Sequence, residues 1–64
     1  MSVVAFARIV RESLEGELES VSAGLLSGGI KDMEEFRFIT GKRQGILTAL
    51  AVVDDAMRRF DEAN

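Results

Sequence analysis

Five residue types are missing from this sequence of 64 residues: histidine, cysteine, proline, tryptophan and tyrosine. The absence of cysteine excludes disulfide bonds and thiolate zinc sites. Without histidine the chain lacks the side chain that proteins use most often for acid–base catalysis and metal binding. Without tryptophan or tyrosine it lacks common interface anchors and base-stacking groups. These absences predict a protein that is not an enzyme and that has no cofactor and no small-molecule substrate.

The chain is also short and only mildly charged. Eight Lys or Arg residues oppose eleven Asp or Glu residues, for a net charge of −3. Residues 1–64 can form one domain at most, and a domain of this size buries only about 60% of the surface that its unfolded chain exposes. Small domains usually compensate with disulfides, metals or oligomerisation. We therefore expect association with further copies of the chain, with a larger protein, or with both.

No segment of the sequence predicts a membrane span. The longest apolar stretch, Ile46 to Val53, has eight residues, whereas a spanning helix needs about 20. The first ten residues contain Arg8 and lack the basic-then-apolar order of a secretion signal.

Apolar residues repeat at intervals of three or four on both sides of one glycine-rich break at residues 27–29. This spacing is typical of one stripe along an α-helix. The first stripe contains Val3, Ala7, Val10, Leu14, Leu18, Val21 and Leu25. The second is a heptad-like seam that contains Phe36, Ile39, Arg43, Ile46, Leu50, Val53, Met57 and Phe60. We predict an all-α fold in which two long helices, about 3–27 and 32–62, form an antiparallel αα-hairpin around a turn at 28–31.

Stop and start signals flank the predicted turn. If Gly29 takes the left-handed position after the first helix, the helix ends in a Schellman motif. Asp32 is expected to cap the second helix, with Glu35 three residues later, as in a capping box. Gly16 lies in the middle of the first helix, where it either loosens the helix or marks a close contact.

Each predicted helix also carries apolar or small residues away from its seam. At about 100° per residue, a continuous track on the second helix consists of Phe38, Gly41, Gly45, Ala49, Val52 and Ala56. Its two glycines and first alanine have the small-xxx-small spacing that lets helix backbones approach closely. The first helix has a smaller second patch, Phe6 and Ile9. We predict that these residues form an interface. The alternative is that a chain with 47% hydrophobic residues leaves some outside its core by composition alone.

Arg43 is the polar member of the predicted seam. If residues whose numbers sum to about 62 face each other in the hairpin, Arg43 lies near Glu17 or Glu19. One interpretation is an arginine that extends to the edge of the seam and pairs with a glutamate. The other is a buried polar residue that fixes the register or the oligomeric state.

Neither metal chemistry nor nucleic-acid binding is favoured by the charged residues. Glu12, Glu15 and Glu19 share one helical side, but the di-iron bundles that use such carboxylates also need histidines. The glycines of the turn lack the flanking residues of a phosphate-binding loop. The basic residues lie in small groups among acids, as in 58–62, and do not form the stripe expected of a nucleic-acid-binding protein.

The segment from Leu25 to Asp32, followed by Phe36, Gly41 and then Gly45 with Ile46, resembles a family of small helical proteins. These proteins are encoded in the morphogenesis gene clusters of tailed bacteriophages, near the portal and terminase genes. Their pattern is a helix, a Gly-Lys/Ala-Asp turn, an aromatic residue and G-x-x-x-G-[IL] in a second helix. The match covers about half of this chain. The resemblance implies a virion or assembly component, located in the virion or the host cytoplasm.

Three hypotheses for function follow. The leading one is a non-enzymatic structural or assembly protein of a phage virion, associated with the capsid, portal or tail. The second is a small regulatory adaptor that binds a host or phage protein. The third is a dimeric helical bundle that binds nucleic acid, which the acidic net charge disfavours.

Overall fold

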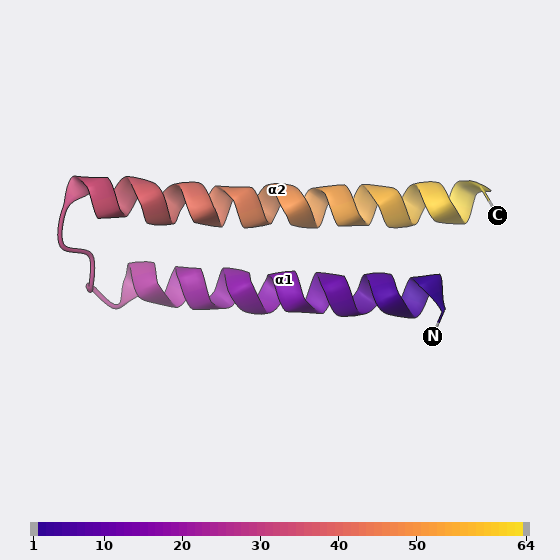
Figure 1. Ribbon diagram of the computed structural model, residues 1–64, viewed down its shortest axis with the longest axis horizontal. Coiled ribbons are helices and arrows are strands. Elements are labelled where there is room, and N and C mark those ends of the chain that lie inside the picture. Colours follow the sequence, from indigo (N-terminus) through magenta and orange to yellow (C-terminus); the bar gives the residue numbers. More distant parts are fainter. Residues whose placement is uncertain (1, 64) are drawn as a thin grey trace.

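The protein is a hairpin of two long helices. The structure is a computed structural model that describes residues 2–63. Within these residues the chain forms α1, Val3–Leu26, and α2, Met33–Ala63, and no strand. The helices lie side by side and run in opposite directions, so that the beginning of α1 lies beside the end of α2 (Figure 1). The predicted all-α class and helical hairpin are confirmed.

Side-chain caps define the beginning of both helices. The Ser2 hydroxyl accepts a hydrogen bond from the Ala5 N–H at 3.0 Å. Asp32 caps α2 as predicted, because its Oδ1 accepts from the Glu35 N–H at 2.8 Å. The Glu35 carboxylate in turn accepts from the Lys31 N–H at 3.1 Å, one residue before the position that a capping box uses. The beginning of each helix is thus determined by residues within four positions of each other.

The turn between the helices differs from the prediction at its first glycine. Gly28, with φ of 77°, takes the left-handed conformation, and Gly29 does not. The reason is that α1 ends one residue earlier than predicted, at Leu26, and Ser27 becomes its cap. The Ser27 hydroxyl donates to the carbonyl oxygen of Gly24 at 3.0 Å. The Schellman motif predicted from a left-handed Gly29 was therefore wrong.

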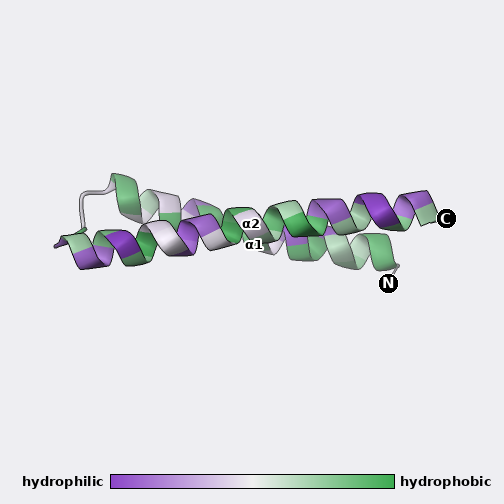
Figure 2. Ribbon diagram, turned by 90° about the horizontal axis from the view of Figure 1, so that it is seen from above, coloured by the Kyte–Doolittle hydropathy of each residue, from purple (hydrophilic) through white to green (hydrophobic). Residues whose placement is uncertain are grey.

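The two predicted apolar stripes face each other and form a thin core. Val21 of α1 and Leu50 of α2 are the most buried residues of this core, each 9% exposed. Most of the other stripe residues are half-buried: Ala7, Val10, Leu14, Leu18 and Leu25 in α1, and Ile39, Ile46, Val53 and Met57 in α2. Viewed from above, the helices cross near their middle, and each alternates between hydrophobic and hydrophilic turns (Figure 2). Such a pair buries one stripe of each helix and leaves the remaining surface to solvent.

The shape of the hairpin is elongated. It measures 49 × 17 × 13 Å, with a radius of gyration of 14.9 Å, whereas a compact domain of this length has a radius of about 11 Å. Its accessible surface is 4941 Å², against about 4,000 Å² for a compact protein of this mass. The hairpin therefore exposes more surface than a compact fold of the same chain.

Arg43 reports the register of the two helices. Its Nε donates to the hydroxyl of Ser22 at 3.3 Å, and the two residue numbers sum to 65 rather than to 62. Arg43 is exposed, so it extends to the edge of the seam as in the first interpretation. Its predicted pairing with Glu17 or Glu19 was wrong, because the register differs by three residues, almost one helical turn.

This register leaves the beginning of α2 uncovered. A sum of 65 places the last residue of α1, Leu26, level with Ile39. The first turns of α2 therefore extend beyond the end of α1 (Figure 1). For this reason Phe36, a predicted member of the seam, remains 45% exposed.

Candidate interaction surface

The large residues of the predicted interface are all exposed. Their exposed fractions are 71% for Phe38, 62% for Val52, 60% for Phe6 and 47% for Ile9. In a folded protein such side chains are usually found at least partly covered. The hairpin by itself does not cover them.

Three of the four small residues of the same prediction also lie outside the hairpin's own packing. Gly41, Gly45 and Ala56 are exposed, and Ala49 is half-buried. A Cβ atom added to either glycine would meet no atom within 4 Å. No contact inside the chain therefore requires glycine at these two positions, although each costs about 1 kcal/mol of helix stability relative to alanine.

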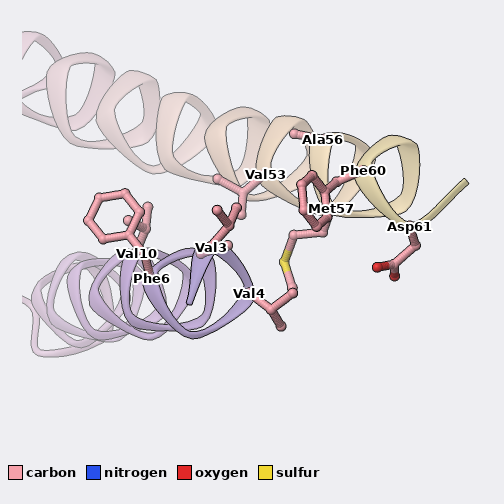
Figure 3. Close-up of a pocket in the computed structure, with 10 residues that line it drawn as sticks. Val3, Val4, Phe6, Val10, Val53, Ala56, Met57, Phe60 and Asp61 are labelled. Carbon is pink, nitrogen blue, oxygen red and sulfur yellow. The ribbon is translucent and has the colours of Figure 1, made fainter. Parts of the chain in front are cut away.

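An apolar groove of about 390 Å³ lies at the open end of the hairpin, between the first turns of α1 and the last turns of α2 (Figure 3). Apart from Asp61, its lining is hydrophobic, and it consists of Val3, Val4, Phe6, Ala7, Val10, Val53, Ala56, Met57, Phe60 and Asp61. Phe6 and Ala56 belong to the predicted interface. Val53 and Met57 belong to the seam, and at this end they are only half-buried. The groove thus joins the seam to the predicted interface.

A second hollow, of about 270 Å³, lies nearer the turn. It is lined by Glu17, Ser20, Val21, Gly24, Phe38, Ile39 and Lys42. Sequence reasoning did not assign the α1 residues of this hollow to a functional surface. A signal was present, because Gly16, Ser20 and Gly24 recur every four residues, the same small-xxx-small spacing as in α2. An added Cβ on Gly16 or Gly24 would also meet nothing within 4 Å.

Both hollows have lining residues on the same side of the hairpin, although the first groove also reaches the other side through Val4 and Asp61. The first groove is lined by Phe6 of α1 and Ala56 of α2. The second hollow is lined by Gly24 of α1 and Phe38 of α2. Within each helix the two residues are 18 positions apart, which is about five complete turns, so they share one side of their helix. We call this side the open face. It carries the second hollow and part of the first groove, together with Ile9, Gly45, Ala49 and Val52.

The opposite side, which we call the polar face, carries hydrogen bonds between the helices. Arg11 donates from Nε to Oδ1 of Asp54 at 2.7 Å, and from a second guanidinium nitrogen to Oδ2 at 3.3 Å. Arg11 also pairs with Glu15 within α1. The Arg43–Ser22 bond lies on this side too, since in each helix its residue is 11 positions, about three turns, from the Arg11–Asp54 bond.

Asp54 is the clearest electrostatic feature of the polar face. The hydrogen bond from Arg11 lowers the pKa of Asp54 below its ordinary value, opposed by partial loss of hydration and assisted by the positive charge. Arg11 is the reciprocal partner, and its pKa is raised chiefly by the same hydrogen bond. Both side chains remain accessible, so solvent screens the pair.

The end of α2 carries ion pairs on its solvent side. Asp55 pairs with Arg59 at 2.9 Å, and Arg58 pairs with Glu62 at 3.0 Å. Arg58 also contacts Asp55, whereas the neighbouring acid Asp54 pairs with Arg11 across the hairpin. These are exposed pairs, each of which contributes at most about 1 kcal/mol.

Within residues 2–63, no group of three or more acidic side chains is placed so that it could hold a metal ion. Neither α1 nor α2 has a stretch that is both long and apolar enough to cross a membrane. Comparison with protein-family models, with curated proteins and with solved structures found no match to this chain. The open face, with its exposed apolar side chains, is therefore the candidate interaction surface of this chain.

Proposed function

We propose that this chain is a non-enzymatic assembly protein that acts through helix–helix contacts made by its open face. The observation that carries the proposal is the exposure of Phe6, Phe38 and Val52 on one side of the hairpin, each at least 60% exposed. Burying such a side chain against a partner helix stabilises a complex by about 1–2 kcal/mol. A partner that covers all three gains several times the free energy of an exposed ion pair.

The thin core supports the same proposal. An unfolded chain of 7.0 kDa exposes about 10,000 Å², so the surface of 4941 Å² means that folding as a lone hairpin buries about half of it. Domains of this size usually bury about 60%. A partner that binds only the folded hairpin stabilises it by mass action. Association would thus supply both the function and part of the folding free energy.

The setting that we propose is the virion of a tailed phage, in which the chain is a capsid-, portal- or tail-associated component. The support is the resemblance of residues 25–32, with the aromatic and glycine positions that follow, to small proteins of phage morphogenesis clusters. In this setting the partners are further copies of the chain or a larger virion protein. Contacts repeated over a particle suit a small chain that presents one apolar face.

Quantitative mass spectrometry of purified particles from a phage that carries the gene tests this proposal. We expect a fixed number of copies per particle, comparable with that of other structural subunits. We also expect Val52→Gln, on the open face, to lower this number severalfold. The matched control is Ala51→Gln, an exposed position about 100° further around α2, which should leave the number unchanged. Absence of the chain from particles, with recovery in a stoichiometric complex with a soluble protein, would favour the adaptor hypothesis.

A further inference from the structure

We propose that the open face is covered by a second copy of this chain, with both hairpins pointing in the same direction and their open ends together. The product is a symmetric four-helix bundle in which α1 of one copy packs on α2 of the other. This inference rests on the proposed function, in which the open face makes the contacts of assembly, and it specifies the occupant of that face.

The size of the open face matches one further copy. The two largest dimensions of the hairpin, 49 and 17 Å, give its broad side an area of about 830 Å². A standard protein interface buries about 800 Å² on each partner. The surplus of accessible surface leads to the same value, since 4941 Å² exceeds the area of a compact chain by about 900 Å². One further copy therefore has enough area to cover the open face.

The charges on the open face also suit a second copy. The hollow nearer the turn contains one acid, Glu17, and one base, Lys42, and neither forms an ion pair within residues 2–63. In this hollow, two copies bring together two acids and two bases, so the charges there balance. Lys42 of one copy can then pair with Glu17 of its own or of the other copy, as a polar layer in an otherwise apolar bundle.

The direction of the second copy follows from the level of the small residues. In α1 they are Gly16, Ser20 and Gly24, and in α2 they are Ala49, Gly45 and Gly41. Taken in this order, each pair of residue numbers sums to 65, as do the cross-helix bonds Arg11–Asp54 and Ser22–Arg43. Small residues of the two helices therefore lie at the same level along the hairpin.

A two-fold axis parallel to the hairpin preserves these levels. It places the small residues of α1 against those of α2 in the other copy, where close approach of antiparallel backbones is sterically allowed. It also joins the two apolar grooves at the open end into one core that contains Phe6 from both copies. A copy in the opposite direction would instead place each groove near the turn end of its partner, so that the two grooves could not form one core.

Because the chain has no cysteine, single spin labels can test this arrangement on the whole protein. Glu62→Cys labels the open end and Lys31→Cys labels the turn, and both positions are exposed. In the proposed dimer, pulsed dipolar spectroscopy should give a label-to-label distance far below the 49 Å length of the hairpin for both variants. Distances near 49 Å for both variants would mean copies in opposite directions and would overturn the proposal.

Sedimentation equilibrium provides the second measurement. The unlabelled chain should have twice the monomer mass of 7.0 kDa at micromolar concentration. Val52→Gln should raise the dimer Kd at least tenfold, and Ala51→Gln should change it less than twofold, with circular dichroism verifying that both remain helical. A stable folded monomer or a trimer would overturn the inference. A monomer that is still incorporated into particles would leave the proposed function intact, whereas a dimer that is absent from particles would contradict the function alone.

Discussion

The two broad faces of the hairpin differ in whether their side chains find partners within the chain. On the polar face, Arg11 and Arg43 reach across the seam to Asp54 and Ser22. On the open face, large apolar side chains such as Phe38 are exposed, and a Cβ added to any of the helical glycines would meet nothing within 4 Å. The polar face has hydrogen bonds that join the two helices, whereas the large apolar side chains of the open face are left uncovered by the hairpin.

This difference separates the residues that hold the hairpin from those that are available to a partner. Hydrogen bonds of the polar face are exposed and contribute little to stability, but they join the helices at one register. The open face carries the larger store of unburied apolar surface, which contributes only when something covers it. A substitution on the open face should therefore change association, and a substitution on the polar face should change the stability of the hairpin.

The largest effect is expected from Gly45→Leu on the open face. The added side chain would separate the backbones of packed helices, so association should be lost. The isolated hairpin should remain helical, because leucine is a better helix former than glycine by about 0.8 kcal/mol and no atom lies within 4 Å of its Cβ position. Sedimentation and thermal unfolding of the same variant measure the two effects.

Two controls belong to this variant. Gln44→Leu adds a similar side chain at the preceding exposed position, away from the open face, and should leave association unchanged. Gly45→Ala should stabilise the free hairpin by about 1 kcal/mol and weaken association less than leucine does. A Gly45→Leu variant that is more stable and fully associated would show that Gly45 faces solvent in the assembled protein, and the contrast between the faces would fail there.

An intermediate loss of stability is expected from Asp32→Ala. This residue caps α2 at the turn, so its loss should destabilise the whole hairpin and not one face in particular. Loss of the cap to the Glu35 N–H should lower the free energy of unfolding by about 1 kcal/mol, as measured by urea denaturation at fixed protein concentration. Asp32→Asn keeps a capping oxygen and should lose much less. If Asp32→Ala abolished association while leaving the unfolding free energy unchanged, the turn itself would be part of the contact surface.

The smallest effect is expected from Asp54→Asn on the polar face. Because the pKa of Asp54 is lowered in the folded protein, its contribution is fully present above the unfolded pKa of about 3.9. It is lost as the pH falls through the folded value. The variant should therefore lose less stability than the wild type when melting is followed from pH 5 to pH 2.5. Identical pH profiles would show that the Arg11–Asp54 pair does not contribute in solution.

Several features of the fold were predictable because they depend on neighbours in the sequence. The apolar spacing of three and four indicated both helices and an apolar stripe on each of them. The structure shows that these stripes pack together, with Val21 and Leu50 the most buried residues. The cap at Asp32 followed from one side chain and one N–H three residues later. The position of Gly28 was missed because the end of a helix is decided by competing hydrogen bonds within one turn, here through Ser27.

The candidate surface was predictable in part. The track of α2 and the patch of α1, including Phe6, were read from helical periodicity, and both are exposed in the hairpin. Periodicity places residues around a single helix, and it contains no information on how two helices are rotated and shifted against each other. For this reason the groove between residues 3–10 and 53–61, and the hollow that contains Glu17 and Lys42, could not be foreseen.

The sequence by itself determined which residues are helical, where the chain turns and which stripe of each helix is apolar, because these depend on local hydrogen bonds and a fixed helical repeat. Only the tertiary structure decided the register, in which facing residues have numbers that sum to 65, and the bond from Arg11 to Asp54. It also decided that the track of α2 and the patch of α1 lie on the same side of the hairpin. Those features depend on the turn geometry and on contacts between residues more than 20 positions apart, where a shift of three residues changes every partner.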